Sequence, residues 1–170
     1  MSLAGWQLSP KLKVSADAVL SRDDEHSITL SSSSSTLTAQ QSAVYGLNAE
    51  WRPLSPLTLN TDLQFSGYKA DLAAGGAGVS GSAWKQEAKY KGGLFTARAA
   101  VTSVGADFYS FASPSVVSDR RTLDGELGLF PADWVSFGAA YNTYTDNLEN
   151  DPAKTTTVQT QTTLSNMLRV

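Results

Sequence analysis

Apolar and polar residues alternate with a period of two along most of this chain, whereas helical periodicity is weak. Leu57, Leu59 and Leu63, for example, alternate with polar residues that include Asp62. Successive side chains of a β-strand point to opposite faces, so the pattern predicts strands with one apolar and one polar face. We predict eight such strands, at residues 10–22, 40–52, 56–70, 82–91, 94–106, 119–130, 133–146 and 155–169.

The predicted connections alternate between short and long. Pro or Gly occurs in or beside the short ones, at 53–55, 91–93 and 131–132. The long polar ones cover residues 22–39, 71–81, 107–118 and 146–154. Consecutive long hairpins of this kind favour a single all-β domain over residues 1–170, an antiparallel up-and-down β-barrel of about eight long strands. We leave residues 1–4 out of this prediction, because such a start can derive from an expression vector.

Most predicted strands have 10–15 residues, whereas soluble strands average about 5–6 and a tilted membrane strand needs about 9–11. Aromatic residues also gather toward the strand ends, and about ten residues separate Trp134 from Tyr144. This spacing fits an apolar band of about 25 Å between two aromatic girdles. The alternative is that the aromatics cap the core of a soluble β-sandwich. The predicted girdle contains Trp6, Trp51, Phe95, Phe130, Trp134, Tyr68, Tyr141 and Tyr144.

Composition narrows the classes of function. The 13 basic and 16 acidic residues give a net charge of −3, and no basic stripe indicates a nucleic-acid surface. The chain has no cysteine, so it has no disulfide framework and no thiolate metal site. Charged residues are 17% of the chain, below the roughly 25% of soluble domains. No secretory signal precedes the first predicted strand; in an envelope protein we expect it upstream of this sequence.

The polar positions carry nearly balanced charge, which suits the interior of a closed barrel because paired charges are less costly to bury. Alternatively, they line a wet channel in a wider barrel or the solvated face of a soluble sheet. The predicted inward-facing set contains Lys11, Lys13, Asp17, Glu50, Asp62, Lys85, Glu87, Lys89, Arg98, Asp124 and Glu126. The predicted outward set contains Leu12, Val14, Leu59, Leu63, Phe95, Val101, Leu127 and Phe137.

The segments AEWRPLSPLTLNTDLQFS at 49–66 and LGLFPADWVSFGAAYNTYTDN at 127–147 resemble strand–turn–strand units of bacterial outer-membrane β-barrels, namely porins and TonB-dependent transporters. The resemblance implies a lipid bilayer or detergent as partner, the outer membrane of a Gram-negative bacterium as location, and a structural or passive transport role. Such barrels usually end on an aromatic residue, whereas this sequence ends on Val170. The sequence is therefore compatible with a complete barrel or with an excised piece of a larger one, which further strands of the parent or a second copy of the chain would partner.

Candidate catalytic chemistry is sparse. His26 is the only histidine, and its neighbour Ser27 would point to the opposite face of a strand. The acidic run at 146–152 lacks the spacing of a calcium loop and favours an Asx-rich turn. We predict no enzyme, no catalytic residues, no metal site, no cofactor and no nucleic-acid partner.

Two alternative functions stay open. One is a soluble all-β barrel or sandwich that binds a small apolar ligand or a glycan, and the other is an outer-membrane lipid-modifying enzyme. For the barrel we predict closure: 10–22 pairs antiparallel with 155–169, because an open edge is costly in lipid. Lys11, Lys13 and Asp17 would then point inward beside Gln159 and Gln161.

Overall fold

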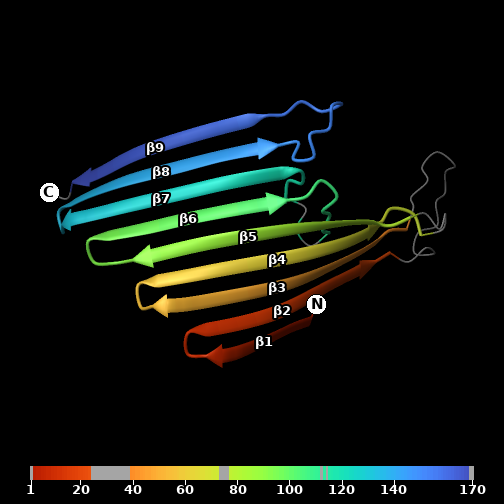
Figure 1. Ribbon diagram of the computed structural model, residues 1–170, viewed down its shortest axis with the longest axis horizontal. Helices are drawn as coiled ribbons and strands as arrows, with labels where there is room; N and C mark the ends of the chain where they lie inside the picture. Colours follow the sequence, from red (N-terminus) through yellow and green to blue (C-terminus); the bar gives the residue numbers. More distant parts are fainter. Residues whose placement is uncertain (1, 24–38, 73–76, 112, 114, 169–170) are drawn as a thin grey trace, which may run out of the picture.

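The computed structural model describes residues 2–23, 39–72, 77–111, 113 and 115–168. These residues form one antiparallel sheet in which each strand pairs with the next along the chain (Figure 1). The strands are β1 (Ser2–Ser9), β2 (Leu12–Arg22), β3 (Gln41–Leu54), β4 (Leu57–Lys69), β5 (Val79–Lys91), β6 (Phe95–Val104), β7 (Arg120–Ala132), β8 (Val135–Asp146) and β9 (Val158–Leu168).

The all-β, antiparallel, up-and-down arrangement is therefore confirmed, and each of the eight predicted strands is present with slightly shifted ends. The ninth, β1, was not predicted. It is short, and its alternation is interrupted near the turn, where its pairing with β2 shifts register between Gln7 and Ser9.

The prediction of a closed barrel is wrong, because the sheet is open. β1 occupies the edge of β2 that was expected to pair with 155–169, and β9 pairs with β8 alone among the described strands. Both edge strands, β1 and β9, run toward the same end of the sheet. Joining them directly would create a parallel pair, which conflicts with the antiparallel pairing predicted for the closure.

The predicted distribution of connections is confirmed. The tight connections after β1, β3, β5 and β7 lie at one end of the sheet, on the left in Figure 1. The strand ends from which the longer connections after β2, β4, β6 and β8 start lie at the opposite end. We call these the short-turn end and the long-loop end.

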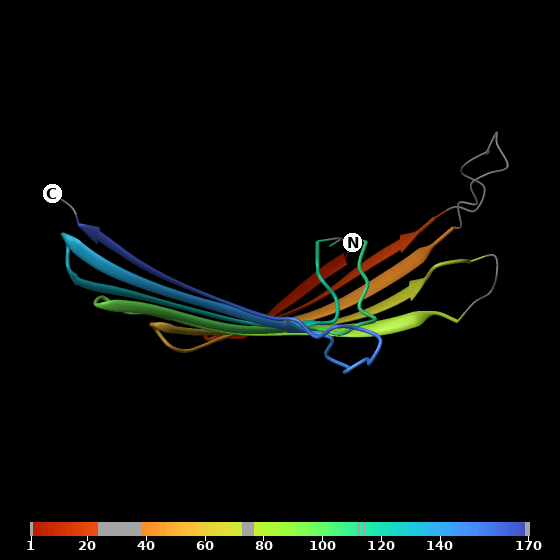
Figure 2. The same cartoon turned by 90° about the horizontal axis from the view of Figure 1, so that it is seen from above.

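The sheet is a trough. In Figure 2 the edge strands rise on the same side, and the connection 105–119 stands on that side. Phe108 of this connection packs with Val44 and Val104, and the cross-strand register places those two residues on one face of the sheet. That face, which also carries Lys13 and Glu87, is the concave face, and the face that carries Leu47 and Leu63 is the convex face.

The strands are staggered across the sheet. Lys13 and Asp124 lie in the same cross-strand row. At the short-turn end, Lys13 lies one residue from the start of β2, whereas Asp124 lies eight residues from the end of β7 at Ala132. At ~3.3 Å per residue and ~4.8 Å between strands, this drift corresponds to a strand tilt of about 40°. β-Barrels have strand tilts in the same range, about 35–45°.

The described residues contain only a small apolar core. Its buried residues are Val44, Ala100, Val104 and Phe108. Phe108 lies on Val44 and Val104, with Ala83 packed against the cluster, so this part of the core forms where the connection 105–119 covers the concave face. No second layer covers the convex face within the part of the chain that the structure describes.

Candidate functional site

The predicted polar set gathers on the concave face. The cross-strand register places Lys13 beside Glu50, Glu50 beside Asn60, and Asn60 beside Glu87. The same alternation puts the other strand members on this face; they are Asp17, Asp62, Lys85, Lys89, Arg98, Asp124 and Glu126. Lys11 lies in the turn between β1 and β2, where its ammonium donates to the Pro53 carbonyl at 3.1 Å.

Glu87 is the centre of this charged surface. Its carboxylate accepts from Arg98 Nε at 2.6 Å and from Asn60 Nδ2 at 3.2 Å, and it pairs with Lys89 Nζ at 2.7 Å. Lys85 Nζ lies 3.9 Å away. The Glu87 side chain is only 6% exposed, so these partners replace the hydration that the buried carboxylate loses.

Arg98 extends the cluster to the next strand. Its second guanidinium contact is with Glu126 Oε1 at 3.0 Å, and the Glu126 side chain is 59% exposed. A single guanidinium therefore joins one buried and one exposed carboxylate. Because its fork of donors is rigid, Arg98 holds both carboxylates in fixed positions on the concave face.

Two further carboxylates are held by amides. Asn48 donates to Asp17 Oδ1 at 2.9 Å, and Asn142 donates to Asp124 Oδ1. Gly46 leaves room for the first pair, because a Cβ at this glycine would lie 2.4 Å from Asp17 Oδ1. Glu50 pairs instead with Arg52 at 2.9 Å. These neutral and ionic partners keep the acidic side chains on the concave face.

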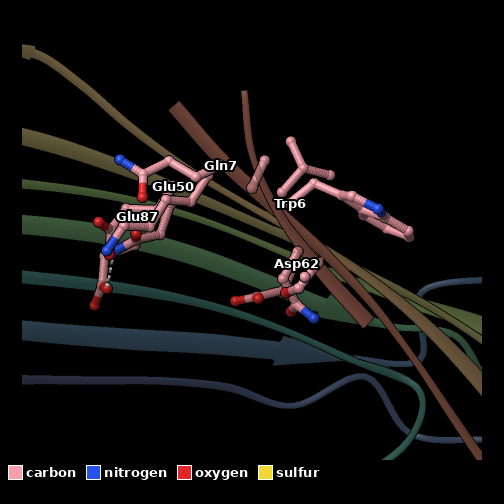
Figure 3. Close-up of a pocket in the computed structure, with 12 residues that line it drawn as sticks. Trp6, Gln7, Glu50, Asp62 and Glu87 are labelled. Carbon is pink, nitrogen blue, oxygen red and sulfur yellow. Dashed lines mark hydrogen bonds between the residues drawn. The ribbon is translucent and has the colours of Figure 1, made fainter. Parts of the chain in front are cut away.

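A groove of about 530 Å³ runs along this face beside β1. Its walls include Gln7, Lys13, Glu50, Asp62 and Glu87. Figure 3 shows Glu50 and Glu87 on one side of the groove and Trp6 pointing away from them. The groove is open, and its lining combines charged and polar side chains with apolar ones such as Trp6 and Val14.

The connection 105–119 covers the long-loop end of the concave face. The Tyr109 N–H donates to Ser66 Oγ at 3.1 Å, and the Tyr109 ring lies 4.2 Å from that of Tyr68. Gly81 permits this contact, since a Cβ there would lie 2.3 Å from the Phe108 nitrogen. Sequence reasoning missed this packing, because it treated residues 107–118 only as a long polar loop.

The long loops are also joined to each other. Asp119 accepts from the Leu148 N–H at 2.8 Å and pairs with Lys154 Nζ at 2.9 Å. The hydrogen bond from Lys154 and the one from Leu148 lower the pKa of Asp119, and the same pairing raises the pKa of Lys154. Asn147 organises the connection between β8 and β9, because its side chain donates to the Asp151 and Lys154 carbonyls and accepts from the Asp151 N–H.

The convex face is mainly apolar, and no described segment covers it. The eight residues of the predicted outward set all occupy it, by the same register argument. Leu47 is 48% exposed, Phe65 52% and Leu127 42%, although all three lie within strands. Soluble monomeric proteins rarely expose large contiguous apolar surfaces of this kind.

The predicted girdle residues divide between the two faces. Trp6, Trp51, Phe95 and Tyr141 lie on the convex face, and the Phe95 ring stacks on Tyr90 at 4.5 Å. Tyr68, Phe130 and Tyr144 lie on the concave face instead, where Tyr144 packs under the Arg120 guanidinium at 3.9 Å. Trp134 lies in the β7–β8 turn. The assignment of these aromatics to a membrane interface stays a prediction.

His26 lies outside the described residues. Within the described ranges, no three His, Cys, Asp or Glu residues are placed to hold a metal ion. The same part of the chain contains no helix long and apolar enough to cross a membrane. Comparisons with models of protein families, with curated proteins and with solved structures found no match.

Proposed function

We propose that this chain forms part of the wall of a bacterial outer-membrane β-barrel, with a structural or passive transport role and no catalytic one. The observation that carries the proposal is the polarity of the two faces relative to the curvature. Most charged residues of the described strands line the concave face, and exposed apolar residues cover the convex face. A membrane barrel needs this arrangement, with a polar interior and a lipid-facing exterior.

A soluble barrel that binds an apolar ligand would need the opposite arrangement. Its apolar residues would have to line the concave face, where this protein instead has Glu87, Arg98 and their ionic partners. Its outer face would have to be polar. In water, leaving apolar area exposed forgoes about 25 cal/mol per Å², so a convex face carrying Leu47, Phe65 and Leu127 is unfavourable there.

Strand length and stagger support the same proposal. β2 to β9 have 10–14 residues, and a tilted strand needs about 9–11 residues to cross the hydrocarbon layer. The tilt of about 40° that follows from the register matches that of membrane barrels. On the concave face, the open groove beside β1 and the charges around Glu87 suit a water-filled interior.

Closure into a barrel then requires further strands. β1 and β9 run in the same direction. If an odd number of strands is inserted between these two edges, every neighbouring pair in the closed barrel is antiparallel. Further strands of a parent barrel fit this requirement. Same-orientation copies of the chain would instead join β9 to β1 in parallel. β9 contains no charged residue and no proline within its 11 residues, so its edge lacks the features that prevent pairing.

Insertion into lipid tests the proposal. The purified chain is refolded into phosphatidylcholine vesicles that contain brominated acyl chains, and tryptophan fluorescence and trypsin digestion are measured. We expect quenching, protection of Lys85, Lys89 and Arg98 within strands, and cleavage at Lys154 in the last long loop. A protein that stays folded and soluble without detergent, and that brominated lipid does not quench, would contradict the proposal.

A further inference from the structure

The charges of the convex face are few and share one sign. Within the nine described strands, this face carries no carboxylate, and its charged residues are Arg22, Lys69 and Arg121. The strand carboxylates, by contrast, lie on the concave face, from Asp17 in β2 to Asp146 in β8. A solvated face would carry both signs, so this separation requires another explanation.

The three cations also lie at one level. Arg22 ends β2, Lys69 ends β4, and Arg121 is the second residue of β7. We measured their positions along the direction perpendicular to the predicted membrane plane, with ~3.3 Å per residue, ~4.8 Å between strands and the strand tilt given above. On this scale, all three lie about 20–30 Å closer to the long-loop end than Trp51 and Phe95 do. This separation matches the apolar band of about 25 Å of a membrane barrel. All three side chains are exposed.

We propose that Arg22, Lys69 and Arg121 form a basic rim that binds phosphate-bearing anionic lipid headgroups in the leaflet at the long-loop end. This inference rests on the proposed membrane function and adds the class of lipid that the convex face selects. Each guanidinium group can donate two parallel hydrogen bonds to two oxygens of one phosphate, and the Lys69 ammonium adds a point charge. Among the described strand residues at the short-turn end, Arg52 and Lys91 lie on the concave face, so these strands contribute no such rim there.

Within the described strands, the convex face carries no carboxylate that could pair with the rim. Asp23 follows Arg22 but accepts from the Gln40 N–H at 3.0 Å. Arg120, the neighbour of Arg121, points to the opposite face and packs on Tyr144. The pair Arg120 and Arg121 therefore provides a matched control: one cation faces the interior and the other faces the lipid.

The test compares two headgroups. Because the chain has no cysteine, Thr145→Cys can carry a single bimane label on the convex face opposite Arg121. The labelled protein is inserted into phosphatidylcholine vesicles with either brominated phosphatidylcholine or brominated phosphatidylglycerol. We expect phosphatidylglycerol to be preferred by about fivefold or more at low salt, since one cation near a membrane surface contributes about fivefold.

The variants assign that preference. R121Q should reduce it severalfold, R22Q/K69Q/R121Q should abolish it, and R120Q should leave it intact. Equal quenching by the two lipids in the parent protein, or equal effects of R120Q and R121Q, would overturn the inference while leaving membrane insertion standing. Absence of quenching by either lipid would overturn the proposed function and this inference with it. A preference that inorganic phosphate removes more effectively than chloride at equal ionic strength would assign the rim to free phosphate instead.

Discussion

The two faces of this sheet are built from the same strands and have opposite chemistry. On the concave face, side chains find partners: Glu87 has four polar neighbours, and Asp17 and Asp124 each accept from an asparagine. On the convex face, side chains such as Phe65 and Leu127 are exposed, and none of the described residues forms a layer over them. The first face provides partners for carboxylates such as Glu87, whereas the second depends on its surroundings.

The comparison shows how curvature distinguishes environments that alternation alone leaves equivalent. A strand with alternating apolar and polar residues fits a soluble barrel or a membrane barrel equally well. Only the side toward which the sheet bends decides which set lies inside. Here the sheet bends toward Glu87 and away from Leu63.

The largest effect is expected from a charge at the middle of the convex face. Leu63 is the central residue of β4, and Leu63→Arg should lower the free energy of unfolding in lipid by about 2–4 kcal/mol. Gln64→Arg, at the neighbouring position on the concave face, should lower the free energy of unfolding much less. Gln64 lies in the same cross-strand row as Gly46 and Asp17, where an arginine has space and a nearby carboxylate. Urea titrations in vesicles measure both; equal losses would contradict the assignment of faces.

Removal of the central carboxylate should have the next largest effect. Glu87→Gln leaves Arg98, Lys89 and Lys85 without their shared partner, at a cost of about 2–3 kcal/mol, between that of an exposed and a buried ion pair. Glu126→Gln removes the exposed partner of the same Arg98 and should cost less than about 1 kcal/mol. A larger loss in Glu126→Gln would show that the cluster is organised differently.

The loop on the concave face provides a smaller test. Gly81→Ala would place a Cβ 2.3 Å from the Phe108 nitrogen, and this backbone clash should cost about 1–3 kcal/mol and displace the connection 105–119. Gly67→Ala is the control, because no atom lies within 4 Å of a Cβ at that position. Proteolysis within 105–119 should increase only in the first variant.

The smallest effect concerns the pairing of Asp119 with Lys154. The pKa of Asp119 is lowered in the folded protein, so its contribution is present above the ordinary carboxyl pKa and is lost as pH falls through the lowered value. The protection of the Leu148 amide against hydrogen exchange, relative to the intrinsic exchange rate at the same pH, should therefore decrease at low pH. In Asp119→Asn, the Leu148 amide should be less protected at neutral pH, and its protection should depend less on pH. If protection as a function of pH were unchanged in this variant, the Asp119 carboxylate would be excluded as the cause.

The sequence predicted the alternation and therefore which residues share a face. Leu12 and Phe137 are far apart in the chain, and both occupy the convex face as expected. Three features could not be read from it. The short β1 has too few alternating residues to be recognised, and the open edges depend on how many strands the sheet contains. The packing of Phe108 on Val44 and Val104 depends on tertiary contacts between distant segments.

The central claim is that lipid contacts the convex face and water the concave face. Val101 and Thr102 are neighbours in β6 on opposite faces, and each can carry a single cysteine label in this cysteine-free chain. In vesicles, we expect the label at Val101→Cys to be quenched by brominated acyl chains and the label at Thr102→Cys by aqueous iodide. The reverse pattern, or equal quenching of both labels by iodide, would contradict the account.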